Sequence, residues 1–210
     1  ALFAYRRSAL WLRYVLPKDG AELTIQAHVS WCEKDAMLKF ALPTTIGGMR
    51  VRSQVAYGVE AHTREAEELL WHAWLACVSP DESRALTVIN DGIYGFDYCA
   101  AELRLSCLRS PAHAGHPVDD VTPVVRQDRF EPRVDQGEHV FQFWLQGGPA
   151  CERLTTIDRE AATKHDVPMA LNVFPQGGGR QVLPGPTLSD SAVEIAAVKM
   201  SEDGRSMILR

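Results

Sequence analysis

The sequence predicts an all-β protein, built as a large antiparallel β-sandwich with few short helices. Short runs of alternating apolar and polar residues recur over the first 145 residues, and clusters of Pro, Gly, Asp and Asn separate them. No amphipathic helix lies between these runs, which favours stacked antiparallel sheets over a βαβ fold. The chain has 210 residues, of which 46% are hydrophobic and 23% are charged, enough for one sizeable core.

The clearest strand is expected at residues 21–31, where apolar and polar side chains alternate with a period of two. One face would carry Leu23, Ile25, Ala27, Val29 and Trp31. Further strands are expected, in chain order, at residues 9–16, 37–42, 51–57, 69–78, 85–90, 102–108 and 139–145. Turn-forming segments such as Pro17–Gly20 and Ser79–Glu82 separate them, because Pro fixes φ and Gly frees it.

The remainder of the chain predicts less regular structure. Residues 152–164 have helical spacing of apolar side chains, for which one turn of surface helix is sufficient. Residues 110–138 are rich in Pro and poor in apolar side chains, so a long loop is expected there. The glycines of residues 176–180 indicate a second flexible connection, and a small C-terminal β subdomain is an option from about residue 165 to 210.

Charge and cysteine content exclude several classes of function. The net charge of -5 comes from acids and bases mixed along the chain, without a basic stripe, so nucleic acid is not an expected partner. No apolar run is long enough to cross a membrane, and no signal peptide is evident. Five widely spaced cysteines without a C-x-x-C pair suggest neither disulfides nor a zinc knuckle, and a cytoplasmic location is expected.

Two pairs of Asp residues are candidates for catalysis, because sugar hydrolysis requires two carboxylates. Asp91 and Asp97 form one candidate pair, although Asn90-Asp91-Gly92 is also an ordinary tight-turn sequence. Asp119 and Asp120 form a second, for which solvated loop charges are the stronger interpretation. No catalytic residue is therefore assigned.

A metal site is a weaker hypothesis. His113, His116 and Asp119 carry side chains that can bind a divalent cation. They lie in a segment rich in Pro and Gly, whereas metal ligands usually sit on rigid elements, so an exposed loop is favoured and no metal ligand is assigned.

Tryptophans are the other clue to sugar binding, because sugars stack on their rings. Trp31 and Trp144 are expected in the core of the sandwich. Trp71 and Trp74 lie an odd number of positions apart, so a strand would point them to opposite faces and leave one of them open to exposure.

Four segments, read in order, resemble the C-terminal region of glycoside hydrolase family 38 α-mannosidases of bacterial type. They are V-S-W-C-E-K-D-A-M-L-K at 29–39, V-A-Y-G-V-E at 55–60, I-N-D-G-I-Y-G-F-D at 89–97 followed by L-R-L-S-C-L-R-S-P at 103–111, and D-Q-G-E-H-V-F at 135–141. The third is the most specific, and it departs from the family pattern at Ile93, where the family often has Lys. A late strand ending in E-D-G and L-R is also similar.

The resemblance implies that residues 1–210 are the C-terminal β-sandwich domain of a retaining α-mannosidase, with a galactose-mutarotase-like supersandwich fold. The abrupt start without Met leads us to expect a fragment. In the family, the catalytic Asp and a divalent metal, usually zinc, belong to an N-terminal barrel, so no cofactor is expected in this fragment. Its expected partners are that catalytic barrel of the same polypeptide and the α-mannoside substrate, and a homo-oligomer is left open. Alone, the fragment is expected to be inactive.

The third segment supplies the candidate sugar-binding residues. A hairpin loop at residues 90–97 is expected to wall the pocket of the barrel, with Asn90, Asp91, Tyr94 and Asp97 offering partners for sugar hydroxyls. Arg109 is added because it could pair with a hairpin carboxylate such as Asp97. The alternative, a hairpin that only fixes sheet packing, stays open, as does a stand-alone lectin-like module using Trp71 or Trp74.

Overall fold

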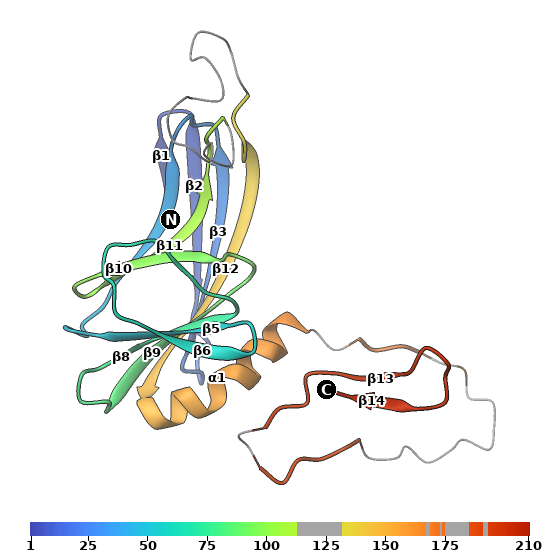
Figure 1. Ribbon diagram of the computed structural model, residues 1–210. Coiled ribbons are helices and arrows are strands. Elements are labelled where there is room, and N and C mark those ends of the chain that lie inside the picture. Colours follow the sequence, from blue (N-terminus) through green and yellow to red (C-terminus); the bar gives the residue numbers. More distant parts are fainter. Residues whose placement is uncertain (113–131, 167–168, 173, 175–184, 191–192) are drawn as a thin grey trace, which may run out of the picture. The chain divides into compact units, whose positions relative to one another are not determined.

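The structure is a computed structural model that describes residues 1–112, 132–166, 169–172, 174, 185–190 and 193–210. The chain divides into two compact units, Ala1–Pro168 and Met169–Arg210. In the part of the chain so described, every strand pair is antiparallel and one α-helix is present (Figure 1). The prediction of an all-β sandwich is confirmed.

The first unit contains two sheets. The large sheet has the strand order β1-β2-β3-β12-β9-β8-β5-β6. Its strands are β1 (Leu2–Tyr5), β2 (Ser8–Val15), β3 (Glu22–Trp31), β5 (Arg50–Val55), β6 (Gly58–His62), β8 (Trp74–Val78), β9 (Arg84–Asn90) and β12 (Gly137–Pro149). The small sheet has the order β4-β11-β10-β7. Its strands are β4 (Met37–Pro43), β7 (Leu69–Leu70), β10 (Gly95–Cys99) and β11 (Glu102–Arg109).

The expected alternation holds best where one face of a strand is buried and the other is not. In β3, Ile25, Ala27, Val29 and Trp31 are buried, whereas His28 is exposed. β12 is longer than expected because it pairs with two partners in succession. Its first ten residues pair with β3, and its second half pairs with β9. It thereby joins the two halves of the large sheet.

Two strand predictions needed correction. The run expected at 69–78 is broken into β7 and β8, which lie in different sheets. The strands β1, β6 and β10 were not expected from the sequence. Each is only four or five residues long, which is too short for an alternation of apolar and polar residues to be recognised.

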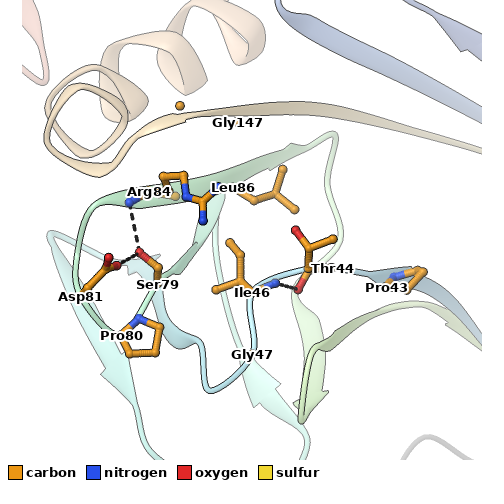
Figure 2. A pocket seen from close by; sticks show the side chains of 13 residues that line it. Pro43, Thr44, Ile46, Gly47, Ser79, Pro80, Asp81, Arg84, Leu86 and Gly147 are labelled. Atoms are coloured by element: carbon orange, nitrogen blue, oxygen red, sulfur yellow. Dashed lines mark hydrogen bonds between the residues drawn. The ribbon is translucent and has the colours of Figure 1, made fainter.

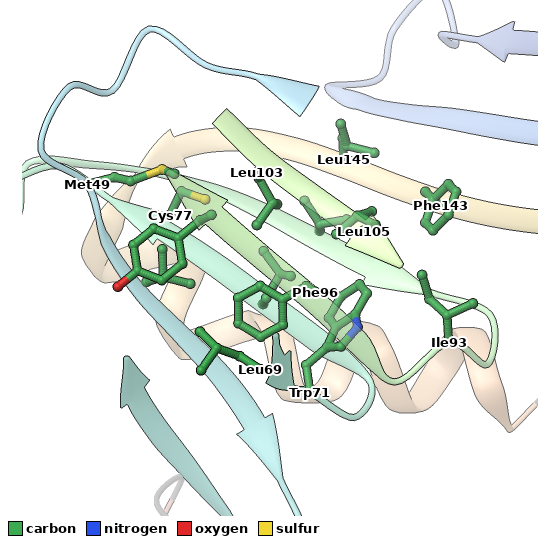
Figure 3. Packing of buried hydrophobic residues seen from close by; sticks show 14 of the residues in the cluster. Met49, Leu69, Trp71, Cys77, Ile93, Phe96, Leu103, Leu105, Phe143 and Leu145 are labelled. Atoms are coloured by element: carbon green, nitrogen blue, oxygen red, sulfur yellow. The ribbon is translucent and has the colours of Figure 1, made fainter. Parts of the chain in front are cut away.

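The main core fills the space between the two sheets (Figure 3). Phe143 and Leu145 project from β12 of the large sheet, and Phe96, Leu103 and Leu105 project from β10 and β11 of the small sheet. Phe96, Phe143, Leu103 and Leu105 are wholly inaccessible to solvent. Sandwich burial of this kind is the main stabilising term.

Helix α1 (Ala150–His165) covers the other face of the large sheet, over β8, β9 and β12. Its sixteen residues correct the expectation of a single surface turn, since Ile157 and Ala161 pack against Trp74, Ala76 and Ile89 in a second core. β8 is therefore buried on both faces, which explains its continuous apolar sequence.

The tryptophans Trp71 and Trp74 are buried in different cores, and α1 covers the second of them. Trp71 joins the main core and Trp74 joins the second core under α1. The prediction that they face opposite ways is right, but the suggestion that one is exposed is wrong, because both are buried. The indole of Trp74 donates a hydrogen bond to Asp158 Oδ1 of α1 at 2.6 Å, which fixes the helix on the sheet.

A buried histidine on β6 makes the stability of the sandwich depend on pH. His62 Nε2 shares a hydrogen bond of 2.7 Å with Ser53 Oγ, and its ring packs edge-on against Phe96. Burial lowers the pKa of His62 below 6.5, although Glu60, 3.9 Å from Nδ1, opposes that shift. Between the folded pKa and about pH 6.5, His62 therefore binds a proton in the unfolded chain but not in the folded chain. The stabilising contribution is complete above about pH 6.5 and is lost as the pH falls towards the folded pKa.

We therefore expect the His62→Gln variant to lose less stability than the parent chain between about pH 7.5 and pH 5. Urea unfolding at the two pH values measures the difference. His28→Gln is the control, because His28 is exposed on β3. Equal pH dependence for the parent and His62→Gln would exclude His62 as a source of acid sensitivity.

The second unit contains a short antiparallel hairpin of β13 (Val198–Met200) and β14 (Met207–Leu209). Its turn is closed by a hydrogen bond from Ser201 N to Ser206 O, and Gly204 has a φ of +67°. None of the helices in the described residues is long and apolar enough to span a membrane.

Candidate functional site

The segment with the most specific motif crosses from one sheet to the other. β9 ends at Asn90 in the large sheet, and β10 begins at Gly95 in the small sheet. Residues 90–95 are therefore an arch between the sheets, not the loop of a hairpin, which corrects the expectation for this segment. The tight turn itself is present, since Gly92 has a φ of +98°, which favours glycine. Ile93 is buried in the main core, so the side chain at this position packs against the core.

Asn90 holds the arch together. Its side chain is fully buried, and its Oδ1 accepts hydrogen bonds from the backbone N–H groups of Gly92, at 2.7 Å, and Ile93, at 2.8 Å. Its Nδ2 donates to the backbone oxygen of His72 at 2.6 Å. The side chain is thus committed to the protein. These bonds position the arch.

A pocket of about 530 Å³ opens beside the arch, and we call it the arch pocket. Three elements contribute its walls: the arch with the segment before β8, the middle of β12, and the end of α1. The lining residues are His72, Asn90, Asp91, Gly92, Tyr94, Gln142, Trp144, Lys164 and His165. Three of the predicted site residues, Asn90, Asp91 and Tyr94, are thereby brought together.

Aromatic rings form part of the pocket wall. The Tyr94 ring is exposed and stacks on His72, with centroids 6.0 Å apart and planes 16° apart. Trp144 is half-buried, and Lys164 Nζ lies 5.1 Å from the centre of its ring. Lys164 is also held by Glu22. Flat apolar faces of this kind suit the C–H face of a sugar.

Trp144 was expected in the core, and it does pack against the second core under α1, but it lies outside the main core and also lines the pocket. Phe143 and Leu145, its neighbours in β12, are the buried residues. The sequence contained an indication of this position. Gln142 and Gln146 lie two residues before and after Trp144 and share its face of the strand, so that face is polar.

Asp91 is the one carboxylate among the described residues that line the arch pocket. It is exposed, and the described residues provide it with no hydrogen bond or ion pair. His165 closes the pocket from the helix side, where its Nε2 lies 2.6 Å from the backbone oxygen of Asn90. The pocket thus offers a charged acceptor and aromatic faces, but not the two carboxylates that glycoside hydrolysis uses.

Asp97 does not line the arch pocket. It lies on β10 between the core residues Phe96 and Tyr98, so its side chain points to the outer face of the small sheet. There it is buried between Lys39 of β4 and Arg104, its direct partner on β11. Asp91 and Asp97 consequently do not share a site.

The cations that pair with Asp97 are Lys39 and Arg104, whereas the sequence suggested Arg109. Arg109 lies five residues further along β11, opposite Met37 of β4, and is exposed. It does not line the arch pocket. Burial lowers the pKa of Lys39, but its hydrogen bonds to Asp97 and Glu68 outweigh that effect and raise it, so the cluster is held as ion pairs.

A second hollow, of about 660 Å³, lies between the turn that follows β8 and the segment that follows β4 (Figure 2). Its polar side chains are used to close these turns. Ser79 Oγ donates to Asp81 and accepts from Arg84 N, and the bond from Ser79 holds the pKa of Asp81 at about 2. Thr44 Oγ1 accepts from Ile46 N in the same way.

The remaining predictions concern the metal site and the second carboxylate pair. His113, His116, Asp119 and Asp120 lie outside the described residues. Sequence reasoning missed His72, Gln142, Lys164 and His165 as pocket residues. None has a local motif, because the tertiary structure brings them together from three distant segments.

Comparison with known proteins bears on the family. The model of the glycosyl hydrolases family 38 C-terminal domain matches residues 2–122. A comparison with curated proteins finds no match.

Two solved structures from Enterococcus faecalis are similar in fold. A protein in the glycosyl hydrolase family 38 has a TM-score of 0.72 and 15% identity over 96% of this chain. An alpha-mannosidase from strain V583 has a TM-score of 0.59 and 14% identity over 75% of it. The aligned parts are 23% and 18% of those two proteins, so this chain spans about a fifth of their length. With the family model covering more than half of its residues, the chain belongs to glycosyl hydrolase family 38 through its C-terminal domain.

Proposed function

We propose that this chain is a non-catalytic module of a retaining α-mannosidase, which supports the catalytic barrel and lines part of its sugar pocket. The observation that carries the proposal is the arch pocket, in which the exposed Asp91 carboxylate lies beside the rings of Tyr94 and Trp144. A carboxylate accepts two sugar hydroxyls, and the rings bind the apolar face of the same sugar. One carboxylate binds a sugar but does not supply the acid and the nucleophile of hydrolysis.

The metal that the resemblance implies is assigned to the catalytic domain. Among the described residues no three His, Cys, Asp or Glu side chains lie together as metal ligands, so these residues do not fit such a group. The role proposed for the described residues is to bind and orient the sugar, and no step is assigned to a metal held by them.

The proposal predicts a loss of catalytic efficiency in the full-length enzyme. Asp91→Asn keeps the shape of the side chain but removes its charge, and a hydrogen bond to a charged group contributes about 1.5–3 kcal/mol. We expect kcat/KM for an aryl α-mannoside to fall about 10- to 150-fold. Steady-state kinetics on the purified enzyme measures it.

Asp81→Asn is the matched control, because Asp81 is an exposed carboxylate that lines the other hollow. We expect its kcat/KM to equal that of the parent enzyme. A loss in Asp81→Asn, with none in Asp91→Asn, would transfer the sugar contact to the hollow of Figure 2.

The alternative of a stand-alone lectin-like module loses its original support, because Trp71 and Trp74 are both buried. Among the described residues, the arch pocket is the site that can still carry it. Calorimetric titration with mannose separates the two functions, since a supporting module without its barrel has an incomplete sugar pocket and should give no heat.

A further inference from the structure

The hairpin of β1 and β2 carries several exposed large apolar side chains. β1 is an edge strand of the large sheet, and its four residues, Leu2–Tyr5, carry no charge. Edge strands usually carry charges or Pro that block further pairing. The exposed large apolar side chains of the hairpin and its end are Leu2, Phe3, Tyr5, Trp11, Tyr14, Val15 and Leu16. We call them the hairpin surface.

The hairpin surface is apolar on both faces of the sheet. Phe3 pairs with Leu10, and Leu10 pairs with the buried Val29, so Phe3 lies on the face that forms the core further along the sheet. Leu2 pairs with Trp11, and both lie on the opposite face. A strand pair that met solvent on one face would alternate apolar with polar residues. This pattern is instead typical of strands covered on both sides.

The core-facing side of the hairpin also contains a hollow. Its volume is about 360 Å³, and its walls come from the hairpin, the end of β3 and the start of β4. Phe3, Leu10, Trp31, Met37 and Leu38 are among its lining residues. The buried indole N–H of Trp31 has no hydrogen-bond partner in the described part of the chain. A buried donor without an acceptor costs about 1–3 kcal/mol, and polypeptide backbone carries the carbonyl acceptors that it lacks.

We propose that a further part of the same polypeptide packs on the hairpin surface, pairs with the free edge of β1 and places an apolar side chain in the hollow. The argument for this occupant is the greater length of the related proteins. The chain spans only 18% and 23% of the two solved relatives, and its family model describes a C-terminal domain, so proteins of this family carry much additional chain. Apart from the exposed Arg13 of β2, the surface is apolar on both faces, and such a surface fits a permanent contact within one chain better than a transient partner. The inference rests on the proposed role as a supporting module.

Hydroxyl-radical footprinting of the full-length polypeptide tests the proposal, with mass spectrometry reading the oxidation of individual tyrosines. Tyr5 and Tyr14 are 58% and 53% exposed here, and Tyr57, at the β5–β6 turn, is 83% exposed. A free hairpin surface would thus be oxidised at roughly two-thirds of the rate at Tyr57. We expect oxidation of Tyr5 and Tyr14 to be at least about tenfold slower than at Tyr57, whatever the protein concentration. Rates near two-thirds would overturn the proposal, and protection that disappears on dilution would assign the surface to a second copy instead.

A charge substitution gives an independent readout. Phe3→Glu places a carboxylate in the hollow, and Tyr57→Glu places one on the opposite edge of the large sheet. In the full-length protein we expect Phe3→Glu to lower the unfolding temperature and restore oxidation at Tyr5, and Tyr57→Glu to do neither. Unchanged protection and stability in Phe3→Glu would contradict a contact in the hollow. These readouts do not involve the sugar site, so a normal kcat/KM in Asp91→Asn would refute the sugar contact of the arch pocket and would leave the contact on the hairpin surface to its own test.

Discussion

Replacing Asn90 by Ala should lower the free energy of unfolding of the sandwich by about 3–5 kcal/mol. The substitution leaves two backbone N–H groups, of Gly92 and Ile93, and the backbone oxygen of His72 without their partners. Each unsatisfied buried group costs about 1–3 kcal/mol, and the costs are not fully additive. Because the arch turns Ile93 into the main core, its loss also disturbs packing there. Urea unfolding followed by tryptophan fluorescence measures the change.

The neighbouring substitution Asp91→Ala is the control for Asn90→Ala. Asp91 is exposed and has no partner among the described residues, so its removal should change stability by less than about 0.5 kcal/mol. If both variants were equally stable, Asn90 would not organise the arch. The assignment of Asn90 to positioning would then fail.

Replacing Arg153 by Ala should cost about 2–4 kcal/mol. This buried arginine of α1 donates to Thr87 Oγ1 of β9 from Nε at 3.1 Å and from Nη2 at 2.8 Å, and it forms an ion pair with Glu160. Burial raises the pKa of Glu160, but the hydrogen bonds from Arg153 and Thr156, together with the charges of Arg153 and Lys164, outweigh that effect and lower it. Truncation removes these bonds and also the packing of the Arg153 stem against Gly148.

Arg159→Ala is the matched control, because Arg159 lies on the exposed side of the same helix. Its removal should change stability by less than about 0.5 kcal/mol. Arg153→Met keeps much of the stem, and we expect it to lose about half as much stability as Arg153→Ala. Equal unfolding free energies for the Arg153 and Arg159 variants would show that α1 does not depend on its buried arginine.

Part of the candidate site could be predicted from one short motif. Asn90, Asp91 and Tyr94 are close in sequence, and a turn keeps neighbours together whatever surrounds it. Asp97 was misplaced because β10 enters the other sheet, where side-chain alternation turns it towards Lys39 and Arg104. No local pattern distinguishes an arch between sheets from a hairpin within one.

The sequence by itself determined the fold class, the alternation of β3 and most strands of the sandwich, because these follow from local periodicity and turn residues. Only the tertiary structure decided which faces are covered. Trp74 is buried because α1 packs over β8, and Trp144 lines a pocket because the end of α1 stops beside it. Burial depends on what packs against a strand from distant parts of the chain, and a strand's own residues do not contain that information.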